Sequence, residues 1–194
     1  MSQVGNNIPD LHCSAVIDGK EINENFCLGD LVGRYLIIFF YPSDFTFVCP
    51  TELHAFQDKL PEFTKRGCQV VGCSVDSVYS HLAWLETPMQ KGGIQGVTYP
   101  LLSDIKKEIS RAFEVLKEDQ GCSYRATFLV DKAGVIRHSS VNDLPLGRSI
   151  DEILRLLDAL QHVEAHGEVC PAGWQKGGKS MNPTVQGLKD YFDK

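Results

Sequence analysis

An unbroken apolar run that leads to a cysteine–proline pair constrains the fold of this chain most strongly. The run from Arg34 to Tyr41 is apolar at consecutive rather than alternate positions, which is typical of a central strand buried on both faces. Pro50 suits the first turn of a helix, because the N–H that proline lacks has no partner there. Cys49 is therefore predicted at a strand-to-helix junction. The apolar positions at helical spacing after it are Leu53, Phe56, Leu60 and Phe63.

A cysteine at a helix start is placed for nucleophilic chemistry. The free N–H groups and the positive end of the helix dipole favour an anion there, and the thiolate is the reactive form of cysteine. Thr46 lies three residues earlier, where its hydroxyl can fold back toward the sulfur, and it occupies the place of a second cysteine in a Cys-x-x-Cys motif. We therefore expect the Cys49 thiolate to attack an outside electrophile and to be resolved by a distant thiol, with Cys170 the best candidate.

Composition limits the partners and the compartment. The net charge of -6 provides no basic stripe for nucleic acid and no polybasic anchor for a membrane. No stretch approaches the roughly 18 apolar residues of a membrane span, and the N-terminus does not resemble a signal peptide. Seven cysteines, an odd number, favour a reducing compartment over a disulfide framework. We expect a cytoplasmic protein whose partners are proteins and small molecules.

Alternating strand and helix patterns predict an α/β chain. A second strand is expected over 68–75, a short helix with Val78, Leu82 and Leu85 on one face, and a further helix from Ser103 to about residue 116.

The second half of the chain predicts a hairpin, a helix and an irregular arm. Strands over 124–130 and 135–141 are joined by a turn, so part of the sheet is expected to be antiparallel. Ser149 and Glu152 form a capping box for a helix that ends near Gly167. Glycine and proline dominate from there to a short helix near the end, so we predict a domain over 1–166 and a C-terminal arm over 167–194.

The cysteine motifs resemble one known family. The segments 40–52 (FYPSDFTFVCPTE) and 169–174 (VCPAGW) resemble the typical 2-Cys peroxiredoxins, the alkyl hydroperoxide reductase C and thioredoxin peroxidase subfamily. The resemblance covers nearly the whole chain and implies a thioredoxin-like fold, with a mixed central β-sheet flanked by helices. It implies that hydroperoxide oxidises Cys49, the peroxidatic cysteine, to sulfenic acid. Cys170 of the other subunit of a head-to-tail homodimer would resolve it, and dimers often assemble into decamers.

The resemblance also implies roles around Cys49. Arg125 would favour the thiolate and donate to peroxide oxygens, Thr46 would orient the O–O bond, and Pro42 would shield the sulfur from water. Glu52 and Arg148 would hold Arg125 in place. No metal or organic cofactor is expected, and thioredoxin or a related dithiol protein would return the electrons.

Alternatives remain open for the function and for the other reactive residues. The same chain could act as a holdase chaperone or as a peroxide-sensing redox relay. The segment 92–96 (GGIQG) with Tyr191-Phe192 only partly matches the elements that confer over-oxidation sensitivity in the family, so we expect intermediate sensitivity. His162 and His166 are interpreted as a solvated helix end. The remaining cysteines, interpreted as structural, are Cys13, Cys27, Cys68, Cys73 and Cys122.

Overall fold

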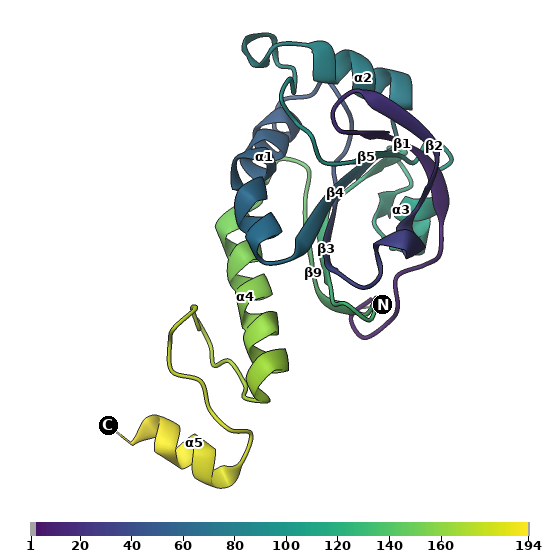
Figure 1. Cartoon of the computed structure of the whole chain (residues 1–194). Helices are drawn as coiled ribbons and strands as arrows, with labels where there is room; N and C mark the ends of the chain where they lie inside the picture. The colour runs from purple at the N-terminus through teal and green to yellow at the C-terminus, as the bar shows by residue number, and fades with distance from the viewer. Residues whose placement is uncertain (1–2, 194) are drawn as a thin grey trace. The chain divides into compact units, whose positions relative to one another are not determined.

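The computed structural model describes residues 3–193, and the chain divides into two compact units (Figure 1). The first runs to Arg148 and the second begins at Ser149. None of the helices described in the structure is long and apolar enough to cross a membrane. The predicted division between residues 166 and 167 stays a prediction.

The first unit is built on a seven-stranded mixed sheet in the order β2-β1-β5-β4-β3-β8-β9. The pairs β3–β4 and β4–β5 are parallel, and the other neighbouring pairs are antiparallel, which confirms the predicted mixed sheet. A separate hairpin joins β6 to β7. The strands are β1 (His12–Ile17), β2 (Glu21–Cys27), β3 (Tyr35–Phe40), β4 (Cys68–Ser74), β5 (Leu101–Ser103), β6 (Leu116–Lys117), β7 (Cys122–Ser123), β8 (Arg125–Val130) and β9 (Ile136–Asn142).

Strand β3 is buried on both faces, as its unbroken apolar run predicts. Successive side chains of a strand point to opposite faces, so Phe39 and Phe40 face different layers. Phe39 stacks on Phe56 of helix α1 with ring centroids 4.1 Å apart, and Phe40 lies 5.2 Å from Phe113 after helix α3. Helices therefore cover both faces of the sheet. The helices of this unit are η1 (Leu28–Leu31), α1 (Cys49–Lys65), α2 (Val78–Glu86), η2 (Met89–Lys91) and α3 (Glu108–Ala112).

The second unit contains helices α4 (Ile150–His166) and α5 (Val185–Phe192), joined by irregular chain with one β-bridge between Val169 and Met181. Ser149 caps α4 by accepting a hydrogen bond from the Glu152 N–H, as the capping box predicts. The predicted end near Gly167 and the short terminal helix are also confirmed.

One prediction about local structure was wrong, and one hairpin was not predicted. The helix expected from Ser103 to about 116 is only α3, because Lys107 adopts a left-handed backbone (φ 62°) and Ile105 is 62% exposed instead of facing the core. The Asp104 carboxylate instead accepts hydrogen bonds from the N–H groups of Ile109 and Ser110, in the first turn of α3. It thus caps this helix although it lies four residues before the helix begins. The hairpin β1–β2 was not predicted, because its strands are polar at many positions.

Asp131 closes the turn between β8 and β9. Its Oδ1 accepts the N–H groups of Ala133 (2.8 Å) and Val135 (2.9 Å), and its Oδ2 accepts from Arg137 Nε (2.6 Å). Burial raises the pKa of Asp131, but these donors outweigh burial, and the pKa lies below its ordinary value.

Asp131→Ala is expected to lower the free energy of unfolding at neutral pH by about 1–3 kcal/mol, because two turn N–H groups lose their acceptor. A carboxyl group whose pKa is depressed by folding stabilises above its unfolded-state pKa, and this contribution is lost as pH falls through the folded-state pKa. Urea titrations should therefore show the gap between variant and wild type narrowing toward about pH 3. The exposed Asp119→Ala is the control, with little change at either pH. A gap that widens in acid would contradict the assignment.

Candidate active site

Cys49 begins helix α1, directly after the loop that follows β3. The thiol is fully buried, and Pro50 occupies the first turn as predicted. The preceding residue, Val48, makes no side-chain hydrogen bond that would cap the helix. The positive end of the α1 dipole therefore lies at the sulfur, and no side chain of the N-cap residue accepts the free N–H groups of the first turn.

Arg125 is the first residue of β8, and its guanidinium reaches the sulfur. The antiparallel pairing of β3 with β8 sets Phe39 opposite Thr127, which brings the start of β8 beside the loop that leaves β3. Arg125 Nη1 donates to Cys49 Sγ at 3.3 Å, and Nε donates to the Leu144 carbonyl at 2.6 Å. A permanent cation in hydrogen-bond contact stabilises a thiolate over a thiol.

Glu52 lies three residues along α1 from Cys49 and joins two arginines. Its carboxylate accepts from Arg125 Nη1 (2.8 Å), from Arg148 Nε (2.9 Å) and Nη2 (2.7 Å), and from the Arg148 backbone N–H (3.1 Å). Arg148 also donates to the Ala126 carbonyl at 2.8 Å. Side-chain exposure is 2% for Glu52, 4% for Arg125 and 3% for Arg148. The group holds two buried cations and one carboxylate, which leaves a net charge of about +1. A thiolate at Cys49 brings the net charge of the group to zero.

Pro42 and Thr46 occupy the loop between β3 and α1. Pro42 is buried and has no N–H to donate. The Thr46 hydroxyl donates to the Ser43 carbonyl at 2.9 Å, which leaves its oxygen lone pairs as acceptors. The structure therefore brings Cys49 into one hydrogen-bonded group with the two arginines and Glu52, whereas the Thr46 hydroxyl donates within its own loop.

A buried network that the sequence reasoning missed holds this loop. Asp44 accepts from the Tyr41 hydroxyl at 3.0 Å, and its Oδ2 lies 2.8 Å from Nδ1 of His81 on α2. The Asp44 N–H donates to the Asp76 carboxylate at 2.9 Å. Phe45, the next residue, has a left-handed backbone (φ 54°), which is uncommon for an aromatic residue. The strained turn at Phe45 is thus held by hydrogen bonds of the preceding residue, Asp44. The sequence does not indicate this network, because its members come from different elements.

Cys170 lies in the second unit, where its Sγ is 3.7 Å from the Ala159 carbonyl oxygen. Burial raises the pKa of the Cys170 thiol, and Arg155 partly opposes this rise. The pairing of Cys170 with Cys49 stays a prediction. In the same unit, His162 stacks on His166 and packs against Trp174, and is more enclosed than the expected solvated helix end.

Burial opposes the ionisation of three of the remaining cysteines. Burial raises the pKa of Cys13 and of Cys68 to about 12 and the pKa of Cys73 well above its usual range. Thiols that ionise so weakly are poor nucleophiles, which agrees with their structural interpretation. Cys27 is partly exposed and donates a hydrogen bond to the Asp10 carboxylate.

Comparisons with known proteins agree with the geometry. Residues 4–139 match the model of the AhpC/TSA family, and residues 159–194 match the C-terminal domain of 1-Cys peroxiredoxin. The chain is 50% identical over 195 residues to Peroxiredoxin-2 of Mus musculus, covering 100% of this chain and 96% of that protein. It is 53% identical to the chloroplastic 2-Cys peroxiredoxin BAS1 of Hordeum vulgare, covering 97% and 90%.

Two further matches extend this result. The thioredoxin peroxidase of Echinococcus granulosus is 50% identical over 97% of each chain. The crystal structure of reduced 2-Cys peroxiredoxin from Plasmodium vivax superposes with a TM-score of 0.96 at 46% identity over 100% of both chains.

A buried cysteine at a helix start on a thioredoxin-like sheet, hydrogen-bonded to an arginine, defines a thiol-dependent peroxidase. The chain belongs to the AhpC/TSA family of peroxiredoxins, and within it to the typical 2-Cys peroxiredoxins.

Proposed function

We propose that the protein reduces hydrogen peroxide and organic hydroperoxides through Cys49 and Cys170. The observation that carries the proposal is the hydrogen bond from Arg125 Nη1 to the buried Cys49 sulfur at the start of α1. Among the cysteines, this one combines a helix start with a cationic partner, the environment that activates a thiolate.

In the first step, the Cys49 thiolate attacks one peroxide oxygen and the O–O bond breaks. The sulfur becomes a sulfenic acid, and the other oxygen leaves with a proton from solvent as water or an alcohol. Arg125 already contacts the sulfur and is placed to donate to the charge that develops on the leaving oxygen. Thr46, through its free lone pairs, would accept from the peroxide O–H and align the O–O bond, while Pro42 would exclude water.

In the second step, the Cys170 sulfur of the partner subunit attacks the Cys49 sulfenic acid, forms a disulfide and releases water. Thioredoxin or a related dithiol protein would then reduce this disulfide by thiol–disulfide exchange. Support for the reductant comes from the relative of Echinococcus granulosus, whose name is thioredoxin peroxidase.

Exposed apolar side chains support assembly into homodimers and into decamers of five dimers. Phe47, beside the active site, is 94% exposed, and Val141 on the last strand of the sheet is 56% exposed. Exposed large apolar groups of this kind mark interaction surfaces. We place the protein in the cytoplasm because its odd number of cysteines suits a reducing compartment.

One equivalent of hydrogen peroxide is expected to convert the reduced protein into a disulfide-linked dimer through Cys49 and Cys170. Intact and non-reducing mass analysis should find this bond in wild type and in neither Cys49→Ser nor Cys170→Ser. The partly buried Cys122→Ser is a matched control that should still form it. A bond within one monomer would overturn the intersubunit step, and an unoxidised Cys49 would overturn the proposed chemistry.

A further inference from the structure

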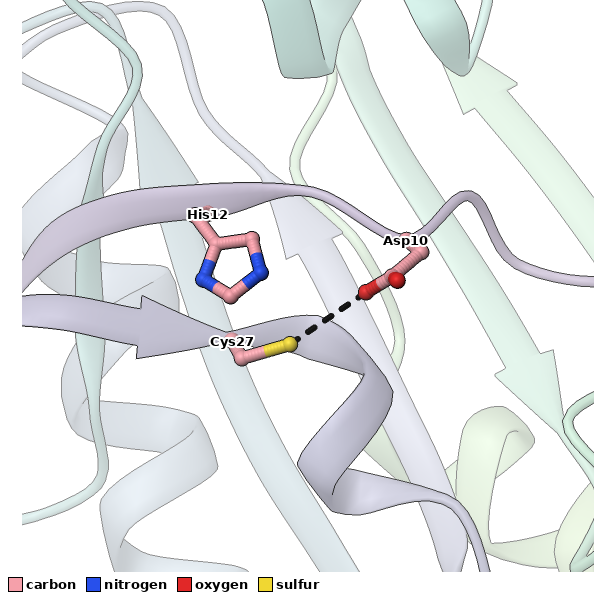
Figure 2. A group of neighbouring side chains, drawn as sticks. All are labelled: Asp10, His12 and Cys27. Carbon is pink, nitrogen blue, oxygen red and sulfur yellow. Dashed lines mark hydrogen bonds between the residues drawn. The ribbon is translucent and has the colours of Figure 1, made fainter.

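Three side chains that can ligate a metal meet at the start of the β1–β2 hairpin. They are Asp10, His12 and Cys27, and their ligand atoms all lie within 4.8 Å of one another. Figure 2 shows them gathered where the two strands pair, with Cys27 Sγ donating to Asp10 Oδ1 at 3.3 Å. We propose that this group is a Zn²⁺-binding site, independent of the peroxidase centre.

The backbone itself brings the three side chains together. His12 on β1 is the cross-strand partner of Cys27 on β2. In the next pair outward, the Leu28 N–H donates a backbone hydrogen bond to the Leu11 carbonyl at 3.1 Å. His12 and Cys27 therefore form a pair without backbone hydrogen bonds, in which side chains approach most closely. Asp10 lies two residues before His12, just ahead of β1, and its carboxylate lies within 4.8 Å of the other two ligand atoms.

Gly29 lies against two of the three ligand atoms. A Cβ built on Gly29 would lie 2.9 Å from Asp10 Oδ1 and 3.4 Å from Cys27 Sγ. A side chain at this position would require the Asp10 carboxylate to shift. The absence of a side chain at Gly29 thus lets the carboxylate and the thiol keep their present positions.

The donor set suits zinc. Thiolate, imidazole and carboxylate are its usual protein ligands, and the exposed positions of Asp10 and His12 leave a fourth position to water. Tetrahedral bonds of about 2.0–2.3 Å place ligand atoms about 3.3–3.8 Å apart, so the contact between Asp10 and Cys27 already has the required separation. Binding releases the Cys27 thiol proton, and the two anionic ligands balance the charge of Zn²⁺ without any change in oxidation state.

The site is distinct from the peroxidase centre. In the sheet order, β5 and β4 separate β1 from β3, the strand that leads to Cys49. Cys27 was interpreted from the sequence as structural, as isolated cysteines usually are. Its two partners lie 15 and 17 positions away along the chain, so no local motif indicates the site.

Cobalt(II) titration tests the proposal, because Co²⁺ reports thiolate ligation by its charge-transfer absorption and tetrahedral geometry by its d–d bands. The full chain carrying Cys49→Ser and Cys170→Ser is used, so that the cysteines of the proposed cycle do not bind the metal. We expect one Co²⁺ per chain, displaced by Zn²⁺. Adding Cys27→Ser should abolish the charge-transfer band, whereas adding Cys122→Ser should leave it unchanged.

The other two ligands provide a second readout. His12→Ala and Asp10→Asn should each weaken Zn²⁺ binding by at least the roughly 10–100-fold that loss of an outer-shell partner costs. In otherwise wild-type protein, Zn²⁺ should raise the unfolding temperature, and this rise should be lost in His12→Ala. Unchanged peroxidase activity of Cys27→Ser would show that the variant is folded. The proposal is overturned by the absence of a thiolate–cobalt band, by a band that survives Cys27→Ser, or by an equal thermal shift in His12→Ala.

Discussion

Arg125→Met is expected to lower kcat/KM for hydrogen peroxide by about 10²–10³-fold, the usual effect of removing one donor aimed at developing charge. The guanidinium touches the sulfur at 3.3 Å, and methionine keeps much of its length while removing the charge and the donors. Stopped-flow oxidation of the reduced protein, with peroxide varied, measures the effect directly.

The control for this prediction is Arg137→Met on β9, an arginine paired with Asp131 and half exposed. It should leave kcat/KM within about twofold, since the residue lies outside the hydrogen-bonded group at Cys49. Because Arg125 is buried with Glu52, urea unfolding of both variants must accompany the kinetics. A folded Arg125→Met protein with nearly wild-type kcat/KM would refute the role assigned to the arginine.

Glu52→Gln is expected to lower the free energy of unfolding by about 3–5 kcal/mol, because it removes the carboxylate charge that two buried guanidinium groups share. The amide keeps the size of the side chain but can accept at only one of its two terminal atoms. Urea-induced unfolding followed by circular dichroism measures the loss.

Glu62→Gln, on the same helix and paired with Lys65 and Arg66 at the surface, is the matched control and should change stability little. If Glu52→Gln unfolds at the same urea concentration as this control, the buried group contributes nothing to stability. In the double variant Glu52→Gln with Arg148→Met, part of the loss should be recovered, since one of the unpaired charges is gone.

Local sequence patterns predict the backbone position of Cys49 but not the arginines around it. Its place at a helix start follows from an apolar run, a proline and apolar residues at helical spacing, all within thirty positions, and the structure confirms it. Arg125 and Arg148 entered only through the family resemblance, because 76 residues separate Arg125 from Cys49 and 96 separate Arg148 from Glu52. No local pattern encodes such contacts.

The sequence alone determined the elements whose signal is local: the buried strand β3, the proline-started helix α1 and the capped helix α4. Only the tertiary structure decided which distant side chains meet. Strand register places Arg125 against the sulfur, the packing of α2 brings His81 to Asp44, and the pairing of β1 with β2 sets His12 beside Cys27. The physical reason is that helix starts and buried runs depend on neighbours within a few residues. Cross-strand and interlayer contacts depend instead on which surfaces the whole chain buries together.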